Sequence, residues 1–227
     1  MIVFFAQSVK EISGLDRFAI RGRALWRLPR VPPTELILAS TSPYRRELLA
    51  RLALPFGVAN PHVDETAQHG ESPAALAVRL AGAKADAVAA RFPTAIVIGA
   101  DQVAVLGDRI LPKPLTHDNA AAQLRAVRGK RVSFLTAVAV VQRAVDRSAT
   151  RLVPCDVEFR DYPDTVIEPY LRAEQPYDCA GAAKIEGLGI ALVKRIEGDD
   201  PTALIGLPLI AVVEMLSDFG CEVLRST

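Results

Sequence analysis

The sequence predicts an α/β protein with a mixed β-sheet. Short apolar runs of strand-like composition alternate with segments whose apolar residues recur at helical spacing. Two long strand-like runs, RVSFLTAVAVVQR and TRLVPCDVEFRDY, follow one another and favour an antiparallel pair. Half of the 227 residues are apolar, which is enough for one sizeable core.

The first strand and helix are expected directly after residue 35. The apolar run 36–40 (LILAS) predicts a buried strand, and Ser42 with Pro43 predicts the N-cap and first position of a helix. The same Ser-Pro pair at 72–73 predicts a second helix. The apolar stripes expected on the two helices are Leu48, Leu49 and Leu52 on the first, and Leu76, Leu80, Ala83 and Ala87 on the second.

The middle of the chain continues this alternation. A strand at 94–101 (TAIVIGAD) runs into an acidic residue, and Gly107-Asp108 predicts the turn of a hairpin between QVAVL and RILPK. Thr116 begins an alanine-rich helix that Gly129 ends. The two long strands come next, and the segments PDTVIEPYLRAEQ and LPLIAVVEMLSDFG predict the last two helices.

Composition excludes several classes of protein. With 27 basic and 26 acidic residues the net charge is +1, so a basic field for nucleic acid or anionic lipid is absent. The apolar runs are far shorter than the ~18 residues of a membrane span. We therefore expect no nucleic-acid partner, no membrane partner and a cytoplasmic location. The three cysteines predict reduced thiols, because they are odd in number and form no CxxC pair: Cys155, Cys179 and Cys221.

Charge separates the first 34 residues from the rest. Residues 1–34 carry six basic and two acidic side chains, a net charge of +4, and include the only tryptophan, Trp26. Residues 35–227 carry a net charge of −3. We expect 1–34 to be a basic leader that is poorly ordered and dispensable, ahead of a single domain at 35–227. A transit-like segment is the alternative.

Segment 40–46 (STSPYRR) is the first candidate binding site. It predicts a strand, a turn and a helix start, where unpaired backbone N–H groups and the helix dipole favour an anion. Ser40 lies in the turn, and Arg45 adds a guanidinium fork suited to phosphate. The alternative is an ordinary capped helix with solvated arginines.

Four more charged positions are candidates. Asp101 follows an apolar strand, a position typical of a metal ligand or general base, although a turn acid is the alternative. Glu65, beside Asp64, is expected to be solvated unless it meets Asp101. Lys84 borders the apolar stripe of its helix and either snorkels or reaches an anion. Lys113 lies between two prolines that stiffen the chain, so it suits phosphate binding or is a plain loop lysine.

The glycine-dense stretch 180–190 is the last candidate. Glycines permit close approach of a ligand, and Glu186 among them could contact the edge of a base. Asp199 and Asp200 are expected in a solvated turn. The phosphate-binding P-loop, a complete GxGxxG, HExxH and GxSxG are all absent from the sequence.

These segments in this order resemble the Maf family of nucleoside triphosphate pyrophosphatases over roughly residues 35–220. The resemblance implies a Maf/ITPase-like fold, in which an elongated, curved mixed sheet with flanking helices forms two lobes around a nucleotide cleft. It implies a catalytic domain that hydrolyses a nucleoside triphosphate to monophosphate and pyrophosphate with Mg²⁺ or Mn²⁺, and a homodimer. The segments are STSPYRRELL, VDET, Lys84-Ala85, GADQV, PKP, CAGAAKIEGLG and IGLPL.

The resemblance also implies roles for single residues. Asp101 would accept a proton from water, and Glu65 would join it on the acidic, metal-binding side of the site. Lys84 and Lys113 would hold the phosphate chain as catalytic residues. Ser40 and Arg45 would form the phosphate-binding turn.

Three positions resemble the branch of the family that acts on 7-methyl-GTP. These are Tyr44, Gln102 and Glu186, where the dTTP/UTP branch usually has arginine, threonine and glutamine. N7-methylation makes guanine cationic, and an aromatic face and a carboxylate both attract such a ring. A dTTP/UTP or broad-specificity pyrophosphatase is one alternative, and a nucleotide-binding regulator of cell division with little catalysis is another.

Overall fold

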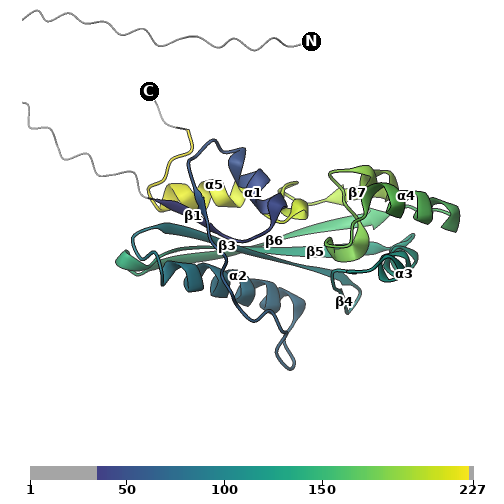
Figure 1. Cartoon of the computed structure of the whole chain (residues 1–227), viewed down its shortest axis with the longest axis horizontal. Helices are drawn as coiled ribbons and strands as arrows, with labels where there is room; N and C mark the ends of the chain where they lie inside the picture. The colour runs from purple at the N-terminus through teal and green to yellow at the C-terminus, as the bar shows by residue number, and fades with distance from the viewer. Residues whose placement is uncertain (1–34, 225–227) are drawn as a thin grey trace, which may run out of the picture. The chain divides into compact units, whose positions relative to one another are not determined.

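The computed structural model describes residues 35–224, which form a mixed sheet flanked by helices (Figure 1). The prediction of an α/β fold is confirmed. The expected leader at 1–34 lies outside the described residues. No described helix is long and apolar enough to cross a membrane.

The sheet has seven strands in the order β2-β1-β3-β5-β6-β7, with β4 paired to β3 beyond the end of β1. The pairs β1·β2 and β1·β3 are parallel, and the remaining pairs are antiparallel. The strands are β1 (Leu36–Ala39), β2 (Gly57–Val58), β3 (Ile96–Leu106), β4 (Arg109–Leu111), β5 (Arg131–Gln142), β6 (Arg147–Phe159) and β7 (Val193–Glu197).

Helices cover both faces of the sheet. Figure 1 shows α2 beneath the strands, α1 and α5 above them, and α3 and α4 gathered at the far end. Ser42, Ser72 and Thr116 cap α1, α2 and α3 through their side chains, as the sequence predicts. The helices are α1 (Pro43–Ala50), α2 (Pro73–Ala89), α3 (His117–Val127), α4 (Ile167–Glu174) and α5 (Leu209–Asp218).

β3 is one continuous strand, whereas the sequence suggested a strand ending at Asp101 and a separate hairpin. β1 pairs with β3 as far as Gly99, and β4 pairs with β3 from Ala104 onward. On the other edge of β3, β5 pairs with it without a break from Val97 to Val105, so β3 stays a strand through the gap. In the described chain, residues 100–103 thus lack a strand on one edge, and Asp101 lies in the middle of β3 at this gap.

Polar residues interrupt the core at the same level of the sheet. On the face that packs against α1 and α5, even-numbered β3 residues are apolar except Gln102, whose cross-strand partner is Thr136. On the face that packs against α2, Asp101 lies between Gly99 and Val103. On the face opposite α2 the core therefore divides into two clusters, one on each side of this level, whereas the cluster under α2 continues past Asp101.

Some local expectations are wrong. The short strands β2 and β7 were not expected, and β6 begins before residue 150. On α2, Ala83 and Ala87 are only half-buried, because a neighbouring row of residues on the helix packs against the sheet instead. That buried stripe consists of Leu76, Ala77, Leu80, Ala81, Lys84, Ala85, Val88 and Ala89.

Candidate functional site

A cleft of about 700 Å³ opens at the gap in the sheet. Its size is typical of a site for a small ligand. Every residue that the sequence singled out for the site lines this cleft, although the residues come from widely separated segments. They are Ser40, Tyr44, Arg45, Glu65, Lys84, Asp101, Gln102, Lys113 and Glu186.

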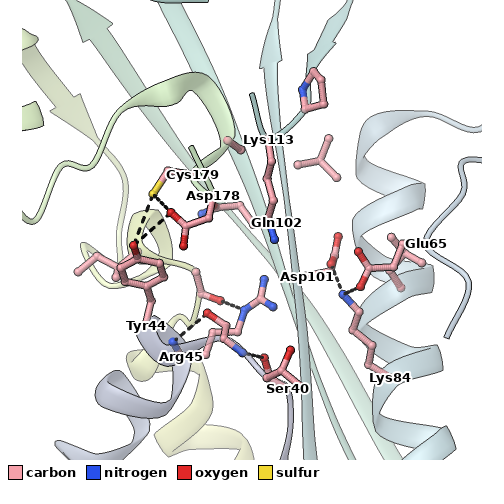
Figure 2. Close-up of a pocket in the computed structure, with 18 of the residues that line it drawn as sticks. Ser40, Tyr44, Arg45, Glu65, Lys84, Asp101, Gln102, Lys113, Asp178 and Cys179 are labelled. Carbon is pink, nitrogen blue, oxygen red and sulfur yellow. Dashed lines mark hydrogen bonds and ion pairs between the residues drawn. The ribbon is translucent and has the colours of Figure 1, made fainter. Parts of the chain in front are cut away.

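Lys84 joins two carboxylates on one side of the cleft (Figure 2). Its Nζ lies 2.6 Å from Asp101 Oδ1 and 2.6 Å from Glu65 Oε1. Lys84 and Asp101 are buried, at 5% and 7% exposure, so Lys84 lies inside the apolar stripe rather than at its border. Burial raises the pKa of Glu65, but the hydrogen bond and charge of Lys84 and the charges of Lys113 and Arg45 outweigh it and lower that pKa.

Gly99 brings Lys84 and Asp101 together. A Cβ atom at position 99 would lie 2.3 Å from the Ala81 carbonyl oxygen and 2.6 Å from the Ala85 nitrogen, so only glycine lets α2 approach β3 this closely. Lys84 lies on α2 between these two contacts, and Asp101 follows Gly99 on the same face of β3. The short ion pair is therefore a consequence of helix–strand packing.

The loop that carries Glu65 is fastened to α2 by Arg79. Arg79 donates from Nε and Nη2 to Glu71 at 2.6 and 2.8 Å, and from Nη2 to the Thr66 carbonyl at 3.0 Å. The hydrogen bond from Arg79, with one from the Gln68 backbone, lowers the pKa of Glu71 to about 2. The fork fixes the backbone one residue after Glu65, so the position of Glu65 does not depend on Lys84 alone.

The turn after β1 forms the opposite side of the cleft. Ser40 is buried, and its Oγ accepts a hydrogen bond from the Ser42 backbone at 3.1 Å. Arg45 donates from Nε to the Gly206 carbonyl at 2.9 Å, which aims the rest of the guanidinium into the cleft. Burial lowers the pKa of Arg45, while the charges of Asp101 and Glu65 act in the opposite direction.

Gln102 holds the floor of the cleft in place. Its amide nitrogen lies within hydrogen-bond distance of Thr136 Oγ1 and the carbonyl oxygens of Ala203 and Leu204, at 2.9, 2.9 and 3.1 Å. Thr136 donates in turn to the Ala203 carbonyl at 2.9 Å. Because these acceptors occupy the amide nitrogen, the polar group that Gln102 offers to a ligand is its carbonyl oxygen.

An aromatic and acidic group lies at the far end of the cleft from Lys84 (Figure 2). The Tyr44 hydroxyl donates to Asp178 Oδ1 at 3.3 Å, and the Cys179 thiol lies 3.5 Å from the same oxygen. Burial raises the pKa of Tyr44 above its usual range, and the neighbouring Cys179 and Asp178 raise it further. Burial and the charge of Asp178 raise the pKa of Cys179 to about 12, so its thiol stays protonated and is a poor nucleophile.

Helix α4 supports the glycine-dense stretch that carries Glu186. Glu174 accepts a hydrogen bond from the Leu188 backbone at 2.7 Å and pairs with Lys184 at 3.5 Å. A side chain at Gly187 would collide with Glu174, since a Cβ there would lie 2.5 Å from its Oε1. Glu186 is thereby presented at the exposed rim of the cleft.

Sequence reasoning missed two features of the site. Asp178 and Cys179 line the cleft, but a single Asp-Cys pair carries no distinctive pattern. Asp200 is buried rather than solvated, because it accepts hydrogen bonds from the Thr202 backbone and hydroxyl and from the Ile210 backbone. It anchors the segment whose carbonyls hold Gln102 and Arg45.

The donor set fits a divalent cation that binds together with a substrate. Among residues 35–224, no group of three or more His, Cys, Asp or Glu side chains could hold a metal ion. Two carboxylates, Glu65 and Asp101, nevertheless lie close together, because each contacts the ammonium group of Lys84 at 2.6 Å. Mg²⁺ in nucleotide sites often takes one or two carboxylates and completes its shell with water and phosphate oxygens.

Several known proteins are similar to this chain over most of its length. A 7-methyl-GTP pyrophosphatase of Nitrosospira multiformis is 58% identical over 189 residues, which cover 83% of this chain and 96% of that protein. Proteins of the same name from Polaromonas sp. and Albidiferax ferrireducens are 60% and 58% identical and cover 82% and 84% of this chain, and 84% and 96% of their own lengths. The model of the Maf-like protein family matches residues 35–219. The cleft thus lies within a match that spans nearly all described residues, and the chain belongs to the Maf-like protein family.

Proposed function

We propose that this protein hydrolyses 7-methyl-GTP to 7-methyl-GMP and pyrophosphate. The observation that carries the proposal is the division of one cleft into two ends. The Glu65–Lys84–Asp101 group suits phosphate chemistry, and the Tyr44–Glu186 end suits a cationic base. Relatives at 58–60% identity named 7-methyl-GTP pyrophosphatase support the substrate.

Asp101 is the proposed general base. Lys84 contacts its Oδ1, which leaves Oδ2 for a water molecule in the cleft. The water oxygen attacks the α-phosphorus, its proton passes to Asp101, and the bond from that phosphorus to the bridging oxygen of pyrophosphate breaks. Lys84, Lys113 and Arg45 stabilise the negative charge that grows on the phosphate oxygens, and Ser40 shapes the turn beside them.

A divalent cation, Mg²⁺ or Mn²⁺, is the proposed cofactor. Glu65 and Asp101 would hold it, and it would supply charge neutralisation at the phosphate oxygens. Lys84 already balances part of the charge of both carboxylates. We therefore expect strong metal binding only when nucleotide phosphates complete the coordination shell.

Base recognition is assigned to Tyr44, Glu186 and Gln102. The Tyr44 ring offers an aromatic face to the cationic ring of 7-methylguanine. The Glu186 carboxylate can accept from the two donors on the Watson–Crick edge of guanine. Gln102 contributes its carbonyl oxygen and fixes the carbonyls beneath the base.

Pyrophosphate release across a nucleotide panel tests the function. We expect kcat/KM for 7-methyl-GTP to exceed that for GTP, dTTP and UTP by at least about tenfold. This is the difference in rate expected from the binding free energy of one cation–π contact together with one carboxylate contact. EDTA should abolish release, and Mg²⁺ or Mn²⁺ should restore it. If the native enzyme prefers dTTP, it is a dTTP/UTP pyrophosphatase instead. If it binds nucleotide without turnover, it is a nucleotide-binding regulator.

We also propose a cytoplasmic homodimer. Cys155 and Cys179 form no disulfide in the described chain, which suits a reducing compartment. The dimer rests on the resemblance to the family, and light scattering on the purified full-length chain measures it directly.

A further inference from the structure

The carboxylates at the two ends of the cleft differ in how their charge is balanced. Glu65 and Asp101 both pair with Lys84. Asp178 and Glu186 also line the cleft, yet within residues 35–224 neither lies within 4.0 Å of a basic group. The aromatic end of the cleft therefore carries negative charge that no ion pair of the described chain neutralises.

Lys184, which lies near the Tyr44 ring, pairs with a carboxylate on α4 rather than with Asp178 or Glu186. Lys184 Nζ lies 5.9 Å from the centre of the Tyr44 ring, but its ion-pair partner is Glu174, on α4. Asp178 is held in place by neutral donors, the Tyr44 hydroxyl at 3.3 Å and the Cys179 thiol at 3.5 Å. Neutral donors fix the direction of a carboxylate without removing its charge.

We propose that Asp178 is a further specificity residue, which selects the cationic, N7-methylated base over neutral guanine by its charge. This inference rests on the proposed function. A carboxylate attracts a cationic base more strongly than a neutral one, and the attraction grows when the bound base excludes water from the cleft. Unmodified GTP presents the same hydrogen-bonding edge and phosphates but lacks the ring charge, so it gains less from Asp178.

Asp178→Asn isolates the charge. The amide oxygen can still accept from the Tyr44 hydroxyl, whereas the negative charge is lost. Titration calorimetry with 7-methyl-GMP and GMP measures the base preference without turnover. We expect the ratio of the two affinities to fall about fivefold in Asp178→Asn, a modest effect because the side chain is exposed in the unliganded cleft. Asp218→Asn, a loss of the same charge at the end of α5 outside the cleft lining, should leave the ratio unchanged.

Tyr44→Phe separates charge from positioning, because it keeps the ring and removes the hydroxyl that contacts Asp178. It should reduce the ratio less than Asp178→Asn does. Equal losses in the two variants would mean that Asp178 acts only by orienting Tyr44, and that outcome overturns the proposal. An unchanged ratio in Asp178→Asn, in a native protein that prefers 7-methyl-GMP, also overturns it. A native protein without that preference would instead overturn the proposed function, and this inference with it.

Discussion

At the scale of single residues, the site is a set of polar groups whose positions depend on one another. Asp101 and Gln102 are adjacent in sequence and point to opposite faces of β3, so one strand supplies both the carboxylate that pairs with Lys84 and the amide at the floor of the cleft. This arrangement works because β3 is unpaired on one edge at that level in the described chain. A ligand in the gap can reach side chains from both faces.

Asp101→Asn tests the proposed base. The amide has the shape of the carboxylate but cannot take a proton, so we expect turnover to fall by at least about a hundredfold. Affinity for 7-methyl-GMP should stay within about tenfold, because most binding contacts lie elsewhere. Pyrophosphate release and calorimetry on the same preparation measure the two quantities. Near-normal turnover would remove Asp101 from the role of base.

Residue types and local spacing anticipate most of the lining of the cleft, but not all of it. Lys84, Asp101 and Glu65 were recognisable as candidates, yet their common contact depends on the packing of α2 against β3. Asp178 is not part of any recognisable sequence pattern, and only its contact with Tyr44 in the fold marks it as a residue of the cleft. Asp200 looked like a turn acid because the donors that bury it include the backbone of α5, ten residues away.

At the scale of elements, the contact between α2 and β3 positions Lys84 beside Asp101. Gly99→Ala should force the two elements apart, since its Cβ would meet backbone atoms of α2 that cannot rotate away. We expect a loss of about 1–3 kcal/mol in the free energy of unfolding, typical of an overpacked core. Turnover should fall as well, because Lys84 and Asp101 would separate. Chemical denaturation and pyrophosphate release measure these effects.

Gly82→Ala is the matched control for that substitution. Gly82 lies within α2, and a Cβ there would have no neighbour within 4 Å. Alanine favours the helix over glycine, so this variant should be equally stable or more stable by up to about 1 kcal/mol, with normal turnover. If both variants behaved alike, close packing at Gly99 would not be what brings Lys84 to Asp101.

Regular elements were predictable where local signals are strong. Ser-Pro starts marked α1 and α2, and two long strand-like runs marked β5 and β6. The strand β2 escaped because two residues cannot show alternation, and β7 escaped because its sequence VKRIE is mostly charged and exposed, with only Val193 buried. The continuity of β3 across Asp101 depends on β5, a partner that local sequence cannot reveal.

At the scale of the whole molecule, the cleft is lined by segments that pack into different clusters of the core. Its lining draws on the turn after β1, on α2, on the segment after β4 and on the glycine-dense stretch. A nucleotide in the cleft would therefore contact groups fastened to all three core clusters. Ligand that binds only the folded state stabilises it by mass action, whatever the local contacts.

Thermal unfolding in the presence of the product 7-methyl-GMP measures this stabilisation. At a concentration of 7-methyl-GMP about 100 times its dissociation constant, we expect stabilisation of about 2.7 kcal/mol. For a domain of this size that corresponds to a rise in Tm of about 5–10 °C. GMP at the same concentration should give a smaller rise, because a tenfold weaker ligand contributes about 1.3 kcal/mol less. Equal shifts would show that the cleft does not distinguish the cationic base.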